Sequence, residues 1–230
     1  MEKLNIKINY LYHSGFTIET KNYFLVFDYY KDSEKGNIAE LLRHKKNIVI
    51  FSSHGHGDHF NREIFTWKNI NQHIKYILSN DIKPGIELQD IYFIAPYQEL
   101  NFDGLYVKTF GSTDLGVSFK VQVDGVTLFH AGDLNWWHWY DESEKDNLQM
   151  EKAFKEEVEK LKGEHFDLVF FPVDPRLKDS YTLGVKYFME KLKPAYLIPM
   201  HFGDNYEPVR EFINSDKNLP VKVLDPLSLK

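Results

Sequence analysis

The residues best suited to chemistry in this sequence lie in one short stretch, Ser52-Ser53-His54-Gly55-His56-Gly57-Asp58-His59. Three imidazoles and one carboxylate occupy six consecutive positions, directly after the apolar run Ile48–Phe51. Neutral imidazole nitrogens and carboxylate oxygens are ligands that zinc, iron and manganese accept, and a site without thiolates keeps coordination positions free for water. The glycines allow a tight turn, so several side chains can face one point. The stretch therefore predicts a metal-binding loop at the end of a buried strand.

A second candidate donor, Asp133, follows the clearest hairpin in the sequence. Val117–Val123 and Val126–His130 are two strand-like segments separated by Asp124-Gly125. An Asp-Gly pair between two such segments is the strongest short-range signal of a β-hairpin. The second strand ends just before Asp133, so we expect the hairpin to position this carboxylate.

Two later buried strands also end at polar residues. Asp167–Phe171 precedes a proline-stiffened loop with Asp174 and Arg176, and Ala195–Pro199 leads to His201. Strand ends in α/β folds are where binding residues commonly lie. Arg176 is a candidate to hold an anionic substrate group, with Asp174 orienting it or a ligand; a surface ion pair is the alternative.

The N-terminal third is predicted to be rich in β-strands. Leu4–Tyr10 and Phe16–Thr20 alternate with period two, and the apolar run Tyr23–Phe27 is typical of a strand covered on both faces. Asp28 closes this last strand, and His13 lies in a turn before the second.

Helical patterns separate the strands. We expect helices over Gly36–His44, after a cap at Asn61, from a capping box at Ser143 to Leu161, and over Thr182–Leu192. Two βα-like units are expected between Asn61 and residue 97, and the helix after Ser143 is expected to have a solvated outer face. This alternation of strands and helices predicts a layered α/β fold.

The pattern His54-x-His56-x-Asp58-His59 resembles the signature of the metallo-β-lactamase fold superfamily. The similarity runs from Tyr12–Gly15 to Pro199–Phe202 and is strongest to small single-domain hydrolases that include the ascorbate phosphate lactonases. The resemblance implies an α/β fold of four layers, an αββα sandwich of two mixed β-sheets flanked by helices.

The resemblance also implies the site. It assigns metal ligands at His54, His56, Asp58, His59, Asp133 and His201. The third histidine that the family uses for its first metal is missing, because no histidine occurs between His73 and His130; Asp114 is the candidate replacement. Zinc is the expected metal, with manganese or iron as alternatives, and both one ion and two remain open. Candidate residues around the ligands or the substrate are Asp28, His13, Asp174, Arg176, His138 and Asp204.

The function expected from such a site is hydrolysis. A metal-bound hydroxide, oriented by Asp58, would attack an ester, lactone or phosphodiester bond of an anionic small molecule. One alternative is a metal-binding sensor or ligand-binding protein with a degenerate first metal site. Another is a metal-dependent nuclease, which the net charge of −6 disfavours because nucleic acid binding normally needs a basic surface.

Length and composition limit the other possibilities. The 230 residues fit a single domain spanning 1–230, and the absence of cysteine excludes disulfides and thiolate ligands. No apolar run is long enough to cross a bilayer, so no membrane partner is expected. Residues 1–5 lack a signal-peptide pattern, which favours a cytoplasmic location. The expected partner is a small-molecule substrate, and the sequence leaves the oligomeric state open.

Overall fold

The chain folds into two β-sheets with helices on their outer faces, and a computed structural model describes residues 4–33, 36–86, 89–102, 104–215 and 221–229. Within these residues the first sheet has the strand order β1-β2-β3-β4-β5-β6, and the second has the order β13-β12-β11-β10-β9-β8-β7. The first sheet comprises β1 (Lys7–Tyr10), β2 (Phe16–Glu19), β3 (Phe24–Phe27), β4 (Ile48–Ser52), β5 (Lys75–Ser79) and β6 (Ile91–Ile94). The second comprises β7 (Glu99–Phe102), β8 (Leu105–Phe110), β9 (Ser118–Val123), β10 (Val126–His130), β11 (Leu168–Pro172), β12 (Tyr196–Met200) and β13 (Lys222–Val223). The helices are α1 (Ile38–Leu42), α2 (Glu144–Lys160), α3 (Leu183–Leu192) and α4 (Glu207–Ser215), with 3-10 helices η1 (Arg62–Asn69), η2 (Pro175–Ser180) and η3 (Pro226–Ser228).

Aromatic side chains fill the space between the two sheets. Phe16 of β2 lies 4.5 Å from Phe170 of β11, and Phe51 of β4 lies 5.3 Å from Phe119 of β9, measured between ring centroids. All of these rings are buried, so the inner faces of the sheets share one apolar core.

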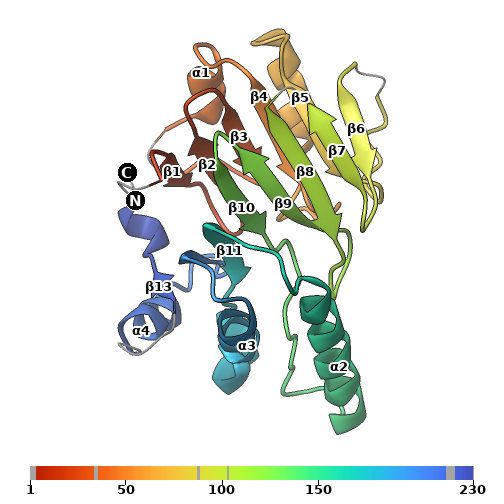
Figure 1. Ribbon diagram of the computed structural model, residues 1–230, viewed down its shortest axis with the longest axis vertical. Helices are drawn as coiled ribbons and strands as arrows, with labels where there is room; N and C mark the ends of the chain where they lie inside the picture. The colour runs from red at the N-terminus through yellow and green to blue at the C-terminus, as the bar shows by residue number, and fades with distance from the viewer. Residues whose placement is uncertain (1–3, 34–35, 87–88, 103, 216–220, 230) are drawn as a thin grey trace.

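The outer faces are covered by helices. Leu42 of α1 and Trp67 of η1 belong to a separate buried cluster on the first sheet. Phe188 of α3 packs 4.7 Å from Phe171 of β11 on the second sheet. Figure 1 shows α1 at one end of the view and α2, α3 and α4 at the other. The four-layer αββα sandwich expected from the sequence is confirmed.

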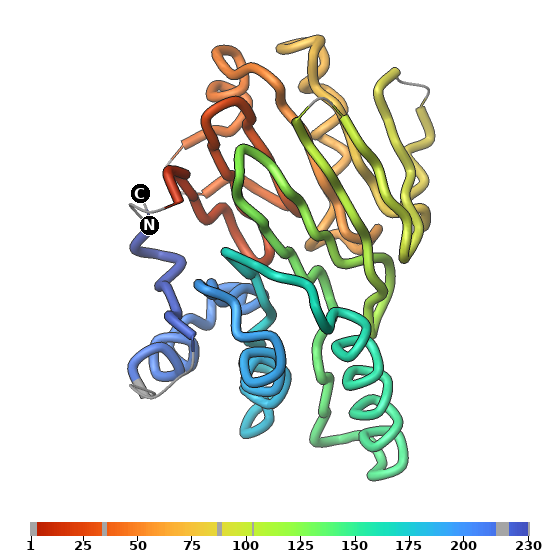
Figure 2. The backbone as a smooth tube through the Cα atoms, in the orientation of Figure 1, coloured from red at the N-terminus to blue at the C-terminus, as the bar shows by residue number. Residues whose placement is uncertain are grey.

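Both sheets are mixed, and this arrangement creates the site. Strands β3 to β6 run parallel, as do β10 to β13, whereas the remaining neighbours are antiparallel. The turn after β1 reaches the end of β12, where the His201 amide donates to the His13 carbonyl at 2.9 Å. Figure 2 shows these segments, red and blue, side by side although they are far apart in sequence.

Several predicted elements form as expected. In the hairpin of β9 and β10, Val123 pairs with Val126, and Asp124 and Gly125 have φ of 48° and 78°. Two positive φ values are the mark of the turn that Asp-Gly favours. Ser143 caps α2 by accepting from the Asp146 amide, and Asn61 caps η1 through the Glu63 amide.

Two local predictions were wrong. The helix predicted after Asn61 forms as the 3-10 helix η1, but within the described residues no helix separates β5 from β6, so the two βα-like units do not form. Pro84-Gly85 lies between those strands and interrupts a helical pattern. The outer face of α2 is not wholly solvated, because Glu157 is only 6% exposed. Strands β7, β8 and β13 and helix α4 were not predicted.

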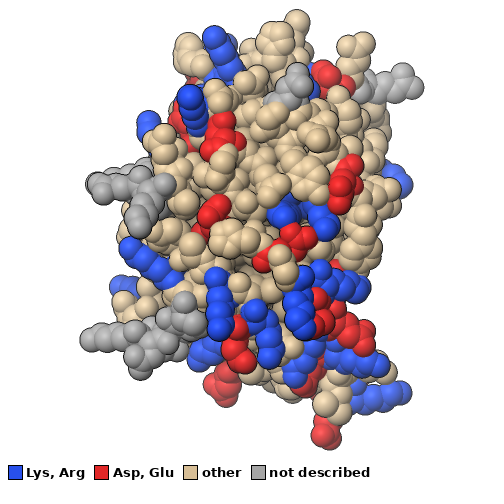
Figure 3. All heavy atoms as spheres, in the orientation of Figure 1, with Lys and Arg blue, Asp and Glu red and all other residues tan. Residues whose placement is uncertain are grey.

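The face drawn in Figure 3 carries basic and acidic side chains of both signs, most densely toward the end of the view where α2 and α3 lie. No single-sign stripe is visible on this face. Among the described residues, no helix combines the length and apolar character needed to cross a membrane. Residues 1–3, part of the segment considered for a signal peptide, lie outside the described residues. The single-domain organisation stays a prediction.

Candidate metal centre

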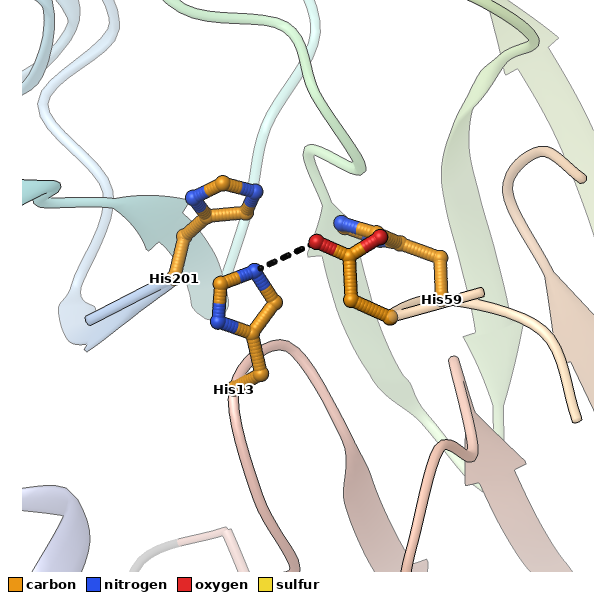
Figure 4. A group of neighbouring side chains, drawn as sticks. His13, His59 and His201 are labelled. Carbon is orange, nitrogen blue, oxygen red and sulfur yellow. Dashed lines mark ion pairs between the residues drawn. The ribbon is translucent and has the colours of Figure 1, made fainter. Parts of the chain in front are cut away.

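The polar residues singled out in the sequence converge because they follow neighbouring strands. The loop 53–59 follows β4, Asp28 follows β3, Asp133 follows β10, and His201 follows β12. The carboxyl ends of parallel strands lie at one edge of a sheet, and the two sheets bring these edges together. His13, His59 and His201 thus come from three distant segments and face one position (Figure 4).

Three residues at this position have strained backbones. His13, Asp28 and His201 have φ of 56°, 43° and 68°, in the left-handed region that non-glycine residues rarely adopt. Such strain persists only where the surroundings enforce it and is concentrated at functional sites. All three side chains are buried.

Asp28 holds the metal loop from behind. Its Oδ1 accepts from the Ser53 amide at 2.7 Å, and its Oδ2 accepts from Ser53 Oγ at 2.7 Å and from His59 Nδ1 at 2.8 Å. Ser53 Oγ lies 3.0 Å from His54 Nδ1 and, since its own proton goes to Asp28, accepts from that nitrogen. This network places a proton on Nδ1 of His54 and of His59, so Nε2 is the nitrogen of each ring that would bind a metal.

Asp174 does the same for His201. Its Oδ2 lies 3.0 Å from His201 Nδ1 and accepts from it, and the same carboxylate accepts from Arg176 Nε and Nη2 at 2.8 and 2.5 Å. Burial opposes ionisation of Asp174, but His201 and Arg176 outweigh it and lower its pKa to about 2. The carboxylate therefore carries charge at neutral pH and fixes both neighbours.

Four buried polar atoms at the centre have no hydrogen-bond partner among the described residues: His13 Nε2, His59 Nε2, His201 Nε2 and Asp133 Oδ1. Asp133 Oδ1 is 3.1 Å from His59 Nε2 and 3.2 Å from His201 Nε2. Ligand atoms of a tetrahedral zinc ion, each about 2.0–2.1 Å from the metal, are about 3.3 Å apart. Buried nitrogen and oxygen atoms that lack hydrogen-bond partners and lie at this spacing fit the ligands of a metal ion.

Asp133 offers its second oxygen to a second group. Asp133 Oδ2 is 3.4 Å from His54 Nε2, and His54 Nε2 is 3.0 Å from His56 Nδ1. Asp114 approaches this group from the loop before β9, with Oδ2 3.8 Å from His56 Nδ1. We call the buried position beside Asp58, His59 and His201 the inner position, and the position beside His54, His56 and Asp114 the outer position.

Charges at the centre are strongly coupled. Burial disfavours the ionised Asp133, but the His201 and His59 rings outweigh it and hold its pKa well below the usual range. Burial also opposes a charged His59, yet Asp133 and Asp28 raise its pKa to about 10. Burial lowers the pKa of His54 and of His13. A buried carboxylate that needs cationic neighbours is the environment a metal ion would occupy.

Two glycines allow the loops to approach each other. A Cβ on Gly116, whose φ is +75°, would lie 1.9 Å from the Ser53 carbonyl oxygen and 2.6 Å from His54 Cβ. A Cβ on Gly132, at φ +53°, would lie 2.8 Å from Ser53 Cβ. The metal loop is therefore packed directly against the backbone of two other loops.

Two cavities open onto the centre. One of about 360 Å³ is walled by Trp137, Trp139 and Met150, and one of about 270 Å³ by Tyr12 and Tyr30 among others. Asp58 and Arg176 line both cavities. A bound molecule can therefore extend to either side of these two residues.

Two predicted site residues lie apart from these groups. His138 lines neither cavity and belongs to no described ligand cluster. Asp204 is exposed, and its neighbour is Tyr12; the partner of His201 Nδ1 is Asp174 instead. The backbone turn explains this outcome, since His201 itself has φ of 68° and Gly203 has φ of 53°.

The sequence reasoning did not identify the roles of Ser53 and His130. His130 donates through Nε2 to the Ser14 carbonyl at 2.9 Å and accepts the Gly132 amide at 3.2 Å, so it ties the His13 turn to the Asp133 loop. Ser53 precedes the first histidine of the loop in the sequence, and this position was the available signal that its hydroxyl bonds the His54 ring.

The fold and the paired ligand groups define a metallo-β-lactamase type of protein, and the chain belongs to that superfamily: the family model described as the beta-lactamase superfamily domain matches residues 7–201. The chain is 27% identical over 227 residues to the UPF0173 metal-dependent hydrolase YtkL of Bacillus subtilis, covering 86% of each chain. A solved structure from Parabacteroides distasonis has a TM-score of 0.70 at 15% identity, covering 96% of this chain and 93% of that one. The metallo-β-lactamase fold protein YhfI of Bacillus subtilis has a TM-score of 0.60 at 13% identity, with 95% of each chain covered. The resemblance inferred from the metal loop is confirmed.

Proposed function

We propose that the protein is a metal-dependent hydrolase that cleaves an ester, lactone or phosphodiester bond of an anionic small molecule. The observation that carries the proposal is the convergence of His59 Nε2, His201 Nε2 and Asp133 Oδ1, buried and without hydrogen-bond partners in the described part of the chain. The metal-dependent hydrolase names of the curated relatives support the same class. The lactonase-like substrate and a cytoplasmic location stay predictions.

The proposed ligands form two sets that share Asp133. The inner position takes Asp58, His59, His201 and Asp133 Oδ1, with His13 as a further candidate because its Nε2 is 3.3 Å from Asp58 Oδ2. The outer position takes His54, His56, Asp133 Oδ2 and Asp114. Zinc is the proposed metal, with manganese or iron as alternatives, since a carboxylate in place of an imidazole favours harder ions. Bound metal would supply Lewis acidity and a water that is activated near neutral pH.

Asp58 is the proposed catalytic residue. Its side chain is 44% exposed and lines both cavities, unlike the buried ligands behind it. The His13 ring beside it holds the pKa of Asp58 well below its usual range, so the carboxylate is ionised at neutral pH. An ionised carboxylate at the mouth of the centre can accept a hydrogen bond from the attacking water and orient it toward the substrate.

Arg176 is the proposed recognition group for the anionic part of the substrate. Asp174 binds Arg176 side-on through Nε and Nη2, which leaves Nη1 without a described partner. The side chain is 60% exposed, lies between the two cavities and stacks over Trp139 at 5.7 Å. A fixed guanidinium with free N–H groups suits a carboxylate or phosphate oxygen.

The test is hydrolysis of a panel of one phosphodiester, one lactone and one ester by the metal-loaded protein. Turnover of at least one substrate should fall by about 10²-fold or more in Asp58→Ala, which removes a positioned acid-base group. Asp179→Ala, which removes an exposed carboxylate of η2, is the matched control and should keep full activity.

Two outcomes would contradict the proposal. Inertness toward the whole panel, with tight metal binding, would favour the sensor. Cleavage of polynucleotides with a steep salt dependence would favour the nuclease.

A further inference from the structure

A buried carboxylate on α2 lies outside the metal centre and has no part in the function proposed above. Glu157 is 6% exposed, whereas its neighbour Glu156 on the same helix is exposed. Its Oε1 accepts from the Gly111 amide at 2.7 Å, and its Oε2 accepts from Tyr97 Oη at 2.8 Å and Lys160 Nζ at 2.7 Å. A buried carboxylate is costly unless its oxygens are satisfied, and here each oxygen is bonded.

The Gly111 amide begins the loop between β8 and β9. This loop carries Asp114 and is the segment in which the family's third metal-binding histidine is missing. Thr113 Oγ1, further along the loop, donates to the Asn135 carbonyl at 2.6 Å and accepts the Asn135 amide at 2.9 Å. The loop ends where the Val117 amide donates to the Ser53 carbonyl at 2.9 Å.

The loop is therefore anchored at four points, and two of them are built from the metal loop and the Asp133 loop themselves. Ser118 Oγ of β9 donates to the Gly111 carbonyl at 3.2 Å, and Glu157 provides the fourth anchor from a separate element. The contact is close: a Cβ on Gly111 would lie 2.9 Å from Glu157 Cδ and 2.9 Å from Tyr97 Oη. Tyr97 has φ of 65°, so the group that donates to Glu157 is itself held in a constrained turn.

Asp114, by contrast, has little support of its own. Its side chain is 46% exposed and lies 3.8 Å from His56 Nδ1, and His56 is also about half exposed. Two exposed ligands lose much side-chain freedom when they bind a metal, so the backbone that carries them needs to be fixed in advance. Within the described residues, the Glu157 anchor is what ties the start of this loop to a long helix.

We propose that Glu157 is a positioning residue for the outer metal position: by holding the Gly111 amide, it fixes the loop that presents Asp114 to the metal. This inference rests on the proposed function, because it takes Asp114 as a ligand. It adds that α2, which contributes no ligand, sets the affinity of the outer position.

The test is a zinc titration of metal-free protein by calorimetry, comparing wild type with Glu157→Ala, Glu157→Gln, Asp114→Ala and the matched control Glu156→Ala. Wild type and Glu156→Ala should each bind two zinc ions, and each ion should have the same affinity in the two proteins. Glu157→Ala should weaken the second ion by about 10- to 100-fold and leave the first unchanged, as is typical when support for a ligand is removed. Glu157→Gln keeps an oxygen that accepts the Gly111 amide, so it should recover much of the affinity.

The outcomes separate the inference from the function on which it rests. Unchanged binding of both ions by Glu157→Ala, with the second ion weakened in Asp114→Ala, would overturn the role of Glu157 alone. Unchanged binding by Asp114→Ala would remove the ligand and the inference together, while the hydrolase proposal would still be judged by Asp58→Ala. Loss of both ions and of helical circular dichroism in both Glu157 variants would show a role in folding and overturn the inference.

Discussion

The substitution Gly116→Ala tests most directly whether close packing of loops positions the metal centre. Gly116 has φ of +75°, and an added Cβ would lie 1.9 Å from the Ser53 carbonyl oxygen. Gly125 is a matched control, because its φ is +78° and a Cβ there would meet no atom within 4 Å. Both substitutions strain the backbone equally, and only one pushes on the metal loop.

The expected magnitudes follow from this geometry. Left-handed backbone costs a non-glycine residue about 1–2 kcal/mol, which is the whole effect expected for Gly125→Ala. Overpacking adds about 1–3 kcal/mol, so Gly116→Ala should lose about 2–5 kcal/mol of unfolding free energy. At about 2–4 °C per kcal/mol for a chain of this size, its Tm should fall by about 4–20 °C.

Metal binding should fall as well. Relief of the contact requires the added Cβ and the Ser53 carbonyl oxygen to separate by about 1.5 Å to reach ordinary van der Waals distance, whereas metal–ligand distances tolerate only about 0.2 Å. The assay is thermal unfolding of the metal-free proteins, followed by elemental analysis after dialysis against zinc. If Gly116→Ala matched Gly125→Ala in both Tm and metal content, the packing argument would be refuted.

Three further predictions concern the metal, the fold and the substrate. Zinc at about 100 times its Kd should stabilise the metal-free protein by about 2.7 kcal/mol, or about 5–11 °C in Tm, and a chelator should reverse this; no shift would argue against a site in the folded chain. Burial opposes ionisation of Glu164, but Lys120 and Lys108 outweigh this effect and lower the pKa of Glu164 below 4.5. The contribution of Glu164 to stability is therefore present above pH 4.5 and is lost as the pH falls through the lowered pKa. Glu164→Gln should therefore have a lower Tm than wild type at pH 7, and thermal scans should show the difference shrinking below pH 4.5; a constant difference would contradict the assignment. Arg176→Lys loses the side-on pair with Asp174 and should raise KM for anionic substrates about tenfold, which corresponds to about 1.4 kcal/mol. KM for neutral substrates should not change. An equal rise in KM for both kinds of substrate would exclude anion recognition by Arg176.

The sequence alone was sufficient for the fold family and for most of the elements around the site. The metal loop, the Asp-Gly hairpin and the capped helix after Ser143 are local signals, because their information lies within a few consecutive residues. The strand ends at Asp133 and His201 were also readable, since apolar runs indicate buried strands and the polar residue that follows marks their end.

The helix after Asn61 was predicted, but its 3-10 geometry was not. A short amphipathic pattern with a good cap is compatible with both α and 3-10 geometry, and packing of Trp67 and Ile64 against the first sheet is decided by tertiary structure. Glu157 was assigned to a solvated face because its partners, Gly111 and Tyr97, are 46 and 60 positions away.

Tertiary structure alone decided how the ligands are held. Asp28 meets His59 across 31 positions, and Asp174 meets His201 across 27, so no local pattern encodes either pair. The same holds for the two oxygens of Asp133, which face different histidines because two sheets meet at one edge. The residue types and their spacing thus determined that a metal could be bound, whereas the packing of parallel strand ends determined which nitrogen faces it, which carboxylate supports each ring and where Asp114 stands. The physical reason is that a side chain's chemistry is carried by its sequence position, but its partners are set by contacts through space.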